Sequence, residues 1–239
     1  MTTRGTLNDC KCFFMTKLKE YFPFLSIRIF LYRYLDYKKS LKLIELKLRW
    51  RDNNPHNFTM IDNRIEDVTF PANKVIVGNY TYGPLRVISY GSYDEYLEIG
   101  CFCSIASGVK FLLGGEHKLN KFSTYPFKRI LINNDEIETF SKGDIILGDD
   151  VWIGTDSLIL SGVKLSRGTV VAAGSVVTKS TEPYSIIGGN PAKLIKMRFS
   201  EDIIENLMSF DYNALNKDLV KDKISKLEAE IDKKWFDNF

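Results

Sequence analysis

Aliphatic side chains recur every six residues along the second half of the chain. The run consists of Leu147, Ile153, Ile159, Leu165, Val171 and Val177. A second column, four residues after each member of the first, holds only small or β-branched side chains: Val151, Ser157, Val163, Thr169, Ser175 and Thr181. An earlier stretch repeats the first column with Ile99, Ile105 and Phe111. A period of six matches neither an α-helix nor a long strand, whose side-chain periods are about 3.6 and 2.

Such a period is expected of a chain that turns a corner after every short strand. Each strand sends its aliphatic side chain inward, three strands complete one triangular coil, and stacked coils bury a continuous column. The sequence therefore predicts a mainly β fold, a parallel β-helix of hexapeptide repeats, over residues 53–198. The period alone does not give the hand of the coil.

The repeat is interrupted by a long insertion at about residues 112–144. An excursion from a regular solenoid has to project outward, and such loops usually carry function. The insertion contains His117, one of two histidines in the chain, shortly after Gly114 and Gly115. We expect these glycines to let the backbone approach a ligand closely. Glu116 is a candidate for orienting the imidazole.

Helical regions are predicted on both sides of the coil. Residues 1–52 carry twelve basic and five acidic side chains and form one or two basic amphipathic helices. We expect an apolar face with Leu41, Ile44, Leu48 and the neighbouring Leu43 and Leu46 to pack on the coil. Residues 199–239 are predicted to form two helices, the first after Ser200, that cap its open end.

The N-terminal region also permits peripheral contact with an anionic membrane. Its apolar candidates for that contact are Phe13, Phe14, Phe22, Phe24, Ile29, Phe30 and Tyr34. Its basic candidates are Lys17, Lys19, Arg28, Arg33, Lys38 and Lys39.

Composition excludes several classes of function. A net charge of +3 argues against a dedicated nucleic-acid binder. No apolar run is long enough to span a bilayer, and the first residues lack the apolar core of a secretory signal. The cysteines form two C-x-C pairs, at residues 10–12 and 101–103, without zinc spacing. We expect free thiols, no metal, and a cytoplasmic protein, with any membrane contact at the inner face.

Five segments carry a resemblance to a known family. They are IGCFCSIASGVKFLLGGEH (99–117), STYPF (123–127), GDDVWIGTDSLILSGV (148–163), AAGSVVTKS (172–180) and GGNPAKLIKMRF (188–199). In this order they resemble the hexapeptide-repeat acyltransferases, and among them the xenobiotic acetyltransferase branch. That branch includes chloramphenicol and streptogramin acetyltransferases and many polysaccharide O-acetyltransferases.

The resemblance covers about residues 75–199 and implies a left-handed β-helix assembled as a homotrimer. It further implies acetyl-CoA as the donor, a hydroxyl as the acceptor, and active sites between adjacent subunits.

By this resemblance His117 is the catalytic base. Acetyl transfer from a thioester to an alcohol requires a group that takes the hydroxyl proton and returns it to the departing thiolate. Imidazole suits that task near neutral pH. No serine or cysteine stands out as a nucleophile, because Cys103 belongs to the inward column of small residues. We therefore expect direct attack on the thioester, and a structural role for His56.

The resemblance also assigns the residues that bind CoA. They are Trp152, Thr155, Ala173, Thr178, Lys179, Lys193, Lys196 and Arg198. The cationic members are suited to the CoA phosphates, and the alternative for each is a solvated surface charge. Trp152 packs on the pantetheine or the acceptor, or alternatively in the core or a trimer contact.

The predicted function is an acetyl-CoA-dependent O-acetyltransferase that modifies a sugar hydroxyl in bacterial surface polysaccharide. An antibiotic O-acetyltransferase and a sugar N-acetyltransferase are the alternatives. A γ-type carbonic anhydrase uses a similar coil but needs three histidine ligands, more than this chain contains. A purely structural solenoid requires neither a histidine-bearing loop nor a basic end.

Overall fold

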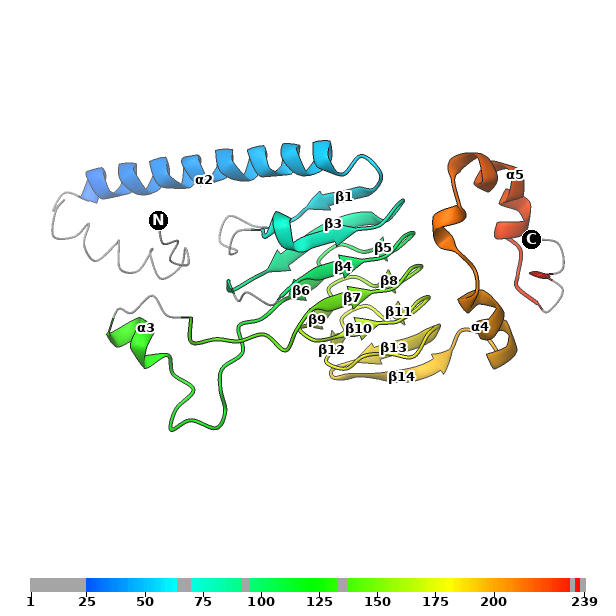
Figure 1. Ribbon diagram of the computed structural model, residues 1–239. Coiled ribbons are helices and arrows are strands. Elements are labelled where there is room, and N and C mark those ends of the chain that lie inside the picture. Colours follow the sequence, from blue (N-terminus) through cyan, green and yellow to red (C-terminus); the bar gives the residue numbers. More distant parts are fainter. Residues whose placement is uncertain (1–24, 64–69, 92–94, 133–136, 233–234, 237–239) are drawn as a thin grey trace.

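The computed structural model describes residues 25–63, 70–91, 95–132, 137–232 and 235–236. Outside them lie the membrane candidates before residue 25 and the thiols of Cys10 and Cys12. Short strands stack into a column, with one long helix at one end and two shorter helices along one side (Figure 1).

The strands form three ladders. Ladder 1 contains β1 (Phe58–Ile61), β3 (Tyr82–Ile88), β5 (Ser104–Ile105), β8 (Trp152–Ile153), β11 (Val170–Val171), β13 (Ser185–Gly189) and β14 (Ala192–Met197). Ladder 2 begins with the second half of β3 and continues through β6 (Lys110–Leu112), β9 (Leu158–Leu160) and β12 (Val176–Val177). Ladder 3 contains β2 (Val75–Val77), β4 (Leu97–Ile99), β7 (Ile145–Leu147) and β10 (Lys164–Leu165). The mainly parallel β architecture is thus confirmed.

The register of the ladders follows the hexapeptide period. Trp152 pairs with Val170 and Leu158 with Val176, so one coil takes three hexapeptides. The predicted aliphatic column is the core: its six members from Leu147 to Val177 are at most 2% exposed. Each of these side chains stacks on its equivalent one coil away, which buries the column continuously.

The insertion leaves the column between β6 of ladder 2 and β7 of ladder 3. It contains the short helix α3 (Phe127–Leu131). The coil keeps its register across the insertion, because Ile99 before it pairs with Leu147 after it.

Helix α2 (Leu25–Asn53) lies at the first end of the column, beside β1. Trp50 anchors it: the side chain is 4% exposed and its Nε1 donates a hydrogen bond to Thr59 Oγ1 at 3.1 Å. Leu43 and Leu46 also pack on the core. The expectation for Leu41, Ile44 and Leu48 was wrong, because all three are exposed. The helix uses its opposite face to contact the coil.

The other end of the column is finished by a hairpin. Strand β14 pairs antiparallel with β13 and so covers the last edge of ladder 1.

At the first end of the column, a 3₁₀ turn, η1 (Ala72–Lys74), leads into β2.

The C-terminal segment contains α4 (Glu201–Met208), the 3₁₀ turn η2 (Tyr212–Ala214) and α5 (Lys217–Leu227). The two expected helices are present, but they do not cap the end as expected. They follow the corner between ladders 3 and 1 (Figure 1). There Arg167 donates hydrogen bonds to the carbonyls of Met208 and Phe210, both at 2.9 Å.

No helix in the described part of the chain is long and apolar enough to cross a membrane.

Candidate active site

The base of the insertion is closed by backbone hydrogen bonds directly beside His117. Glu116 and Phe140 form an antiparallel bridge, with N–H···O distances of 3.1 and 2.9 Å. The bridge therefore holds together, at the edge of the coil, the two ends of the segment that begins at His117. The bridge fixes the backbone from which the imidazole projects.

Two glycines precede this bridge, and each lies against a side chain from another part of the chain. A Cβ atom on Gly114 would lie 2.6 Å from Oε2 of Glu95, and one on Gly115 would lie 2.5 Å from the ring of Tyr90. Gly115 also has φ of +94°, which favours glycine. Both glycines thus make room for side chains of the protein itself.

Glu116 does not have the surroundings expected of an orienting group for His117. Its Oε2 forms an ion pair with Lys142 Nζ at 2.7 Å, and its Oε1 accepts from Ser161 Oγ at 3.5 Å. These contacts tie the start of the loop to its end and to the next coil. Glu116 therefore stabilises the loop base.

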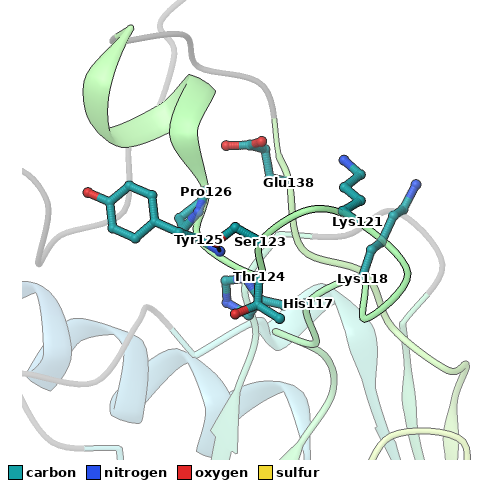
Figure 2. Close-up of a pocket in the computed structure, with 8 residues that line it drawn as sticks. All are labelled: His117, Lys118, Lys121, Ser123, Thr124, Tyr125, Pro126 and Glu138. Carbon is teal, nitrogen blue, oxygen red and sulfur yellow. Dashed lines mark hydrogen bonds between the residues drawn. The ribbon is translucent and has the colours of Figure 1, made fainter.

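His117 faces a hollow of about 480 Å³ that is lined also by Thr124, Tyr125 and Pro126. Figure 2 shows the imidazole beside Thr124, under the turn formed by Ser123 to Pro126. A smaller adjoining hollow adds Lys118, Lys121, Ser123 and Glu138 to the lining. A partly exposed histidine beside an open hollow can exchange a proton with a bound hydroxyl group.

The structure brings some of the predicted CoA residues together along the coil. Trp152 and Lys196 share one row of ladder 1, through pairs that run Trp152–Val170–Ile186–Lys196. Trp152 is 55% exposed, so it is not a core residue of this chain.

The other CoA candidates lie at two corners and in the hairpin. Thr155 and Ala173 occupy successive coils at the corner between ladders 1 and 2, where Gly174 N donates to Thr155 O at 2.8 Å. Thr178 and Lys179 follow β12 at the corner between ladders 2 and 3, from which the loop also leaves. Lys193 is opposite Gly188 in the β13–β14 hairpin. Within one chain, Thr155 and Ala173 therefore lie at a different corner of the coil from the one that carries His117.

The guanidinium of Arg198 has several partners within the protein. Its Nη1 donates to Asp150 Oδ2 at 2.9 Å and to the Gly168 carbonyl at 2.7 Å. The group also lies over the rings of Tyr184 and Phe199. These contacts hold the end of β14 against the corner between ladders 3 and 1.

Cys103 and His56 have structural surroundings. Burial raises the pKa of the Cys103 thiol to about 12, and Sγ donates to the Gly148 carbonyl at 3.2 Å. His56 Nε2 is 2.8 Å from the carbonyl oxygen of Val77. Neither residue lines the hollow beside His117.

Sequence reasoning missed the residues behind the loop. Glu95 is fully buried, receives a hydrogen bond from Ser89 Oγ and lies 3.7 Å from Lys74 Nζ. A charged residue just before a short strand gave no sign of this burial. The contact between Glu95 and Gly114 becomes visible only in the three-dimensional structure.

Known acetyltransferases resemble the greater part of the chain. A probable macrolide acetyltransferase of Lysinibacillus sphaericus is 40% identical over 147 residues, which are 59% of this chain and 82% of that protein. Virginiamycin A acetyltransferase of Staphylococcus aureus is 35% identical over 170 residues, 65% of this chain and 78% of that protein. No family model matches the chain.

Among solved structures, a hexapeptide-repeat-containing acetyltransferase of Vibrio cholerae complexed with acetyl coenzyme A is similar. It is 21% identical with a TM-score of 0.47, and the match covers 74% of this chain and 92% of that one.

The stacked hexapeptides and the named relatives define the protein as an acetyltransferase. Within that class, the chain belongs to the xenobiotic acetyltransferase branch of the hexapeptide-repeat acyltransferases.

Proposed function

We propose that the protein is an acetyl-CoA-dependent O-acetyltransferase in which His117 is the general base. The observation that carries this proposal is the position of His117, which lines an open hollow and follows directly on the hydrogen-bonded base of the loop. The imidazole takes the proton of the acceptor hydroxyl, whose oxygen attacks the thioester carbonyl. It then gives the proton to the departing CoA thiolate. The raised pKa of Cys103 supports direct attack without an acyl-enzyme.

Acetyl-CoA is proposed to lie along the outer surface of the coil. Thr155, Ala173 and Thr178 provide exposed positions for the pantetheine arm. Trp152 provides an exposed ring that can pack on this arm. The phosphates are assigned to the exposed Lys179, Lys193 and Lys196. Arg198, predicted to join them, is proposed to support this end of the site through its bond to Asp150.

A homotrimer of left-handed coils is the assembly we propose. Thr155 and Ala173 lie at a different corner from the one that bears the His117 loop. A site that uses both sets therefore needs corners from two chains, and a closed three-fold arrangement supplies three such sites.

The proposed acceptor is a sugar hydroxyl of bacterial surface polysaccharide. An antibiotic hydroxyl is the second candidate, because the relatives are named for macrolides, chloramphenicol and virginiamycin. An amino sugar is the third. Thr124, Tyr125 and the residues around them line the hollow in which these acceptors would be distinguished.

The test is thiol release from acetyl-CoA with saccharides and antibiotics assayed side by side. We expect His117→Gln to lower kcat by about 10²–10⁴-fold without weakening CoA binding. His56→Gln is the matched control, since it changes the other histidine of the chain, and it should keep its activity. Turnover near that of the wild type in His117→Gln, with a saturating acceptor, would exclude His117 as the base.

A further inference from the structure

Helix α2 carries a continuous apolar seam on the side that faces away from the coil. The seam consists of Ile27, Phe30, Tyr34, Tyr37, Leu41, Ile44 and Leu48, at alternating intervals of three and four residues. Its members range from 40% exposed for Ile27 to 69% for Phe30. Leu25, Ile29 and Tyr32 are exposed as well and lie off this line, near the start of the helix. Seven large apolar side chains in one line still form a surface suited to a partner.

The packing of α2 on the coil places this seam outward. The residues that contact the coil, Leu43, Leu46 and Trp50, each follow a seam residue by two positions. Two residues correspond to about 200° around an α-helix. The seam is therefore on nearly the opposite side, at the end of the column beyond β1 (Figure 1).

The charges of α2 indicate which partner fits. The helix has eight basic and three acidic side chains, a net charge of +5. Arg33, Lys38 and Lys47 border the seam, as do the acids Glu45 and Asp52. The ammonium of Lys38 lies 4.8 Å from the ring centre of Tyr34. Long basic side chains beside an apolar stripe reach anionic head groups while the stripe enters the boundary of the acyl chains.

A second copy of the helix is a poorer partner for the same seam. In a parallel pair joined by this seam, Arg33 of one helix would lie opposite Lys38 of the other, which are like charges, whereas Lys47 would lie opposite Asp52, which are opposite charges. The pair would also bring two helices of +5 together. An anionic surface instead attracts every one of these cations.

We propose that α2 docks the protein on an anionic lipid surface, with the seam from Ile27 to Leu48 in the interface. This surface is separate from the His117 site and does not depend on the proposed reaction. The two tyrosines suit the head-group level, because each has an apolar ring and a polar hydroxyl.

The experiment is co-sedimentation of the full chain with vesicles of phosphatidylglycerol and phosphatidylcholine, or of phosphatidylcholine alone, at low and high salt. We expect binding to the anionic vesicles at low salt, and much less in the other conditions. The double variant Phe30→Ser/Leu41→Ser should weaken this binding at least about tenfold. Its matched control is Leu119→Ser/Phe122→Ser, which removes the same residue types from other exposed positions and should bind as the wild type does.

A second pair of variants tests the charges. Lys38→Gln/Lys42→Gln on α2 should weaken binding to anionic vesicles about tenfold. Lys217→Gln/Lys221→Gln, on exposed positions of α5, should leave it unchanged. The proposal is overturned by equal binding to both vesicle types or by no sedimentation with either. It is also overturned if the seam variant lowers the molar mass in light scattering, since a second copy then covers the seam.

Discussion

The carboxylate of Glu95 lies directly behind Gly114, so that a Cβ atom at position 114 would be 2.6 Å from Oε2. Glu95 is held there by Ser89 and Lys74, and the described residues offer Oε2 no hydrogen-bond partner. The chain passes this carboxylate three residues before His117. The position of the proposed base therefore depends on a glycine that touches a buried acid.

The first prediction concerns this contact. Gly114→Ala should destabilise the protein by about 1–3 kcal/mol and lower kcat, because its methyl group displaces either Glu95 or the loop base. Thermal unfolding and steady-state kinetics measure the two effects. In a Glu95→Ala background the same substitution should cost less, since the space is then free. An equal cost in both backgrounds would show that Glu95 is not the obstacle.

The second prediction concerns the attachment of the C-terminal segment. Arg167 joins Asp149, at 2.8 Å, to the carbonyls of Met208 and Phe210, and the side chains of the ion pair are only 21% and 17% exposed. Arg167→Ala should destabilise the protein by about 2–4 kcal/mol, because it leaves Asp149 and two carbonyls without this donor.

Amide hydrogen exchange in α4 and urea denaturation measure the effect of that change. The matched control is Arg49→Ala, which removes an ion pair with Glu45 whose side chains are 73% and 59% exposed. It should cost less than about 0.5 kcal/mol. Comparable losses for the two arginines would contradict the structural role of Arg167.

The third prediction concerns alkaline pH. Burial raises the pKa of Cys103 to about 12 in the folded protein, whereas an unfolded thiol has a pKa of about 8.5. Above that lower value the unfolded chain releases the proton and the folded chain keeps it. The contribution of Cys103 to stability is therefore complete below about pH 8.5 and falls as the pH rises towards 12.

Cys103→Ala should remove this part of the pH dependence, at a cost of about 1 kcal/mol at neutral pH from the lost packing. Urea denaturation across the alkaline range measures both quantities. Identical slopes for the wild type and the variant would show that Cys103 titrates in the same way in the folded and unfolded chains.

The coil could be predicted from the sequence because its core repeats. Each aliphatic residue from Leu147 to Val177 meets its own equivalent one coil away, so local spacing already specifies the contact. The position of His117 in the insertion followed from the break in the same repeat.

The face of α2 could not be predicted in this way. Leu43 and Leu46 have the same helical spacing as Leu41 and Ile44, and only contact with the coil distinguishes the two stripes. The partners of Glu116 and Gly114 were missed for a related reason. Lys142 and Glu95 are distant in sequence and belong to no repeat, so nothing local pointed to them.

Ile99 pairs with Leu147 across the insertion, so the register of the stacked coils does not depend on the length of the insertion. Residues 113–144 enter and leave at one corner, and the rows above and below continue as if the insertion were absent. The insertion is thus structurally independent of the coil from which it projects. An insertion of another length would therefore leave the pairing of these strands unchanged.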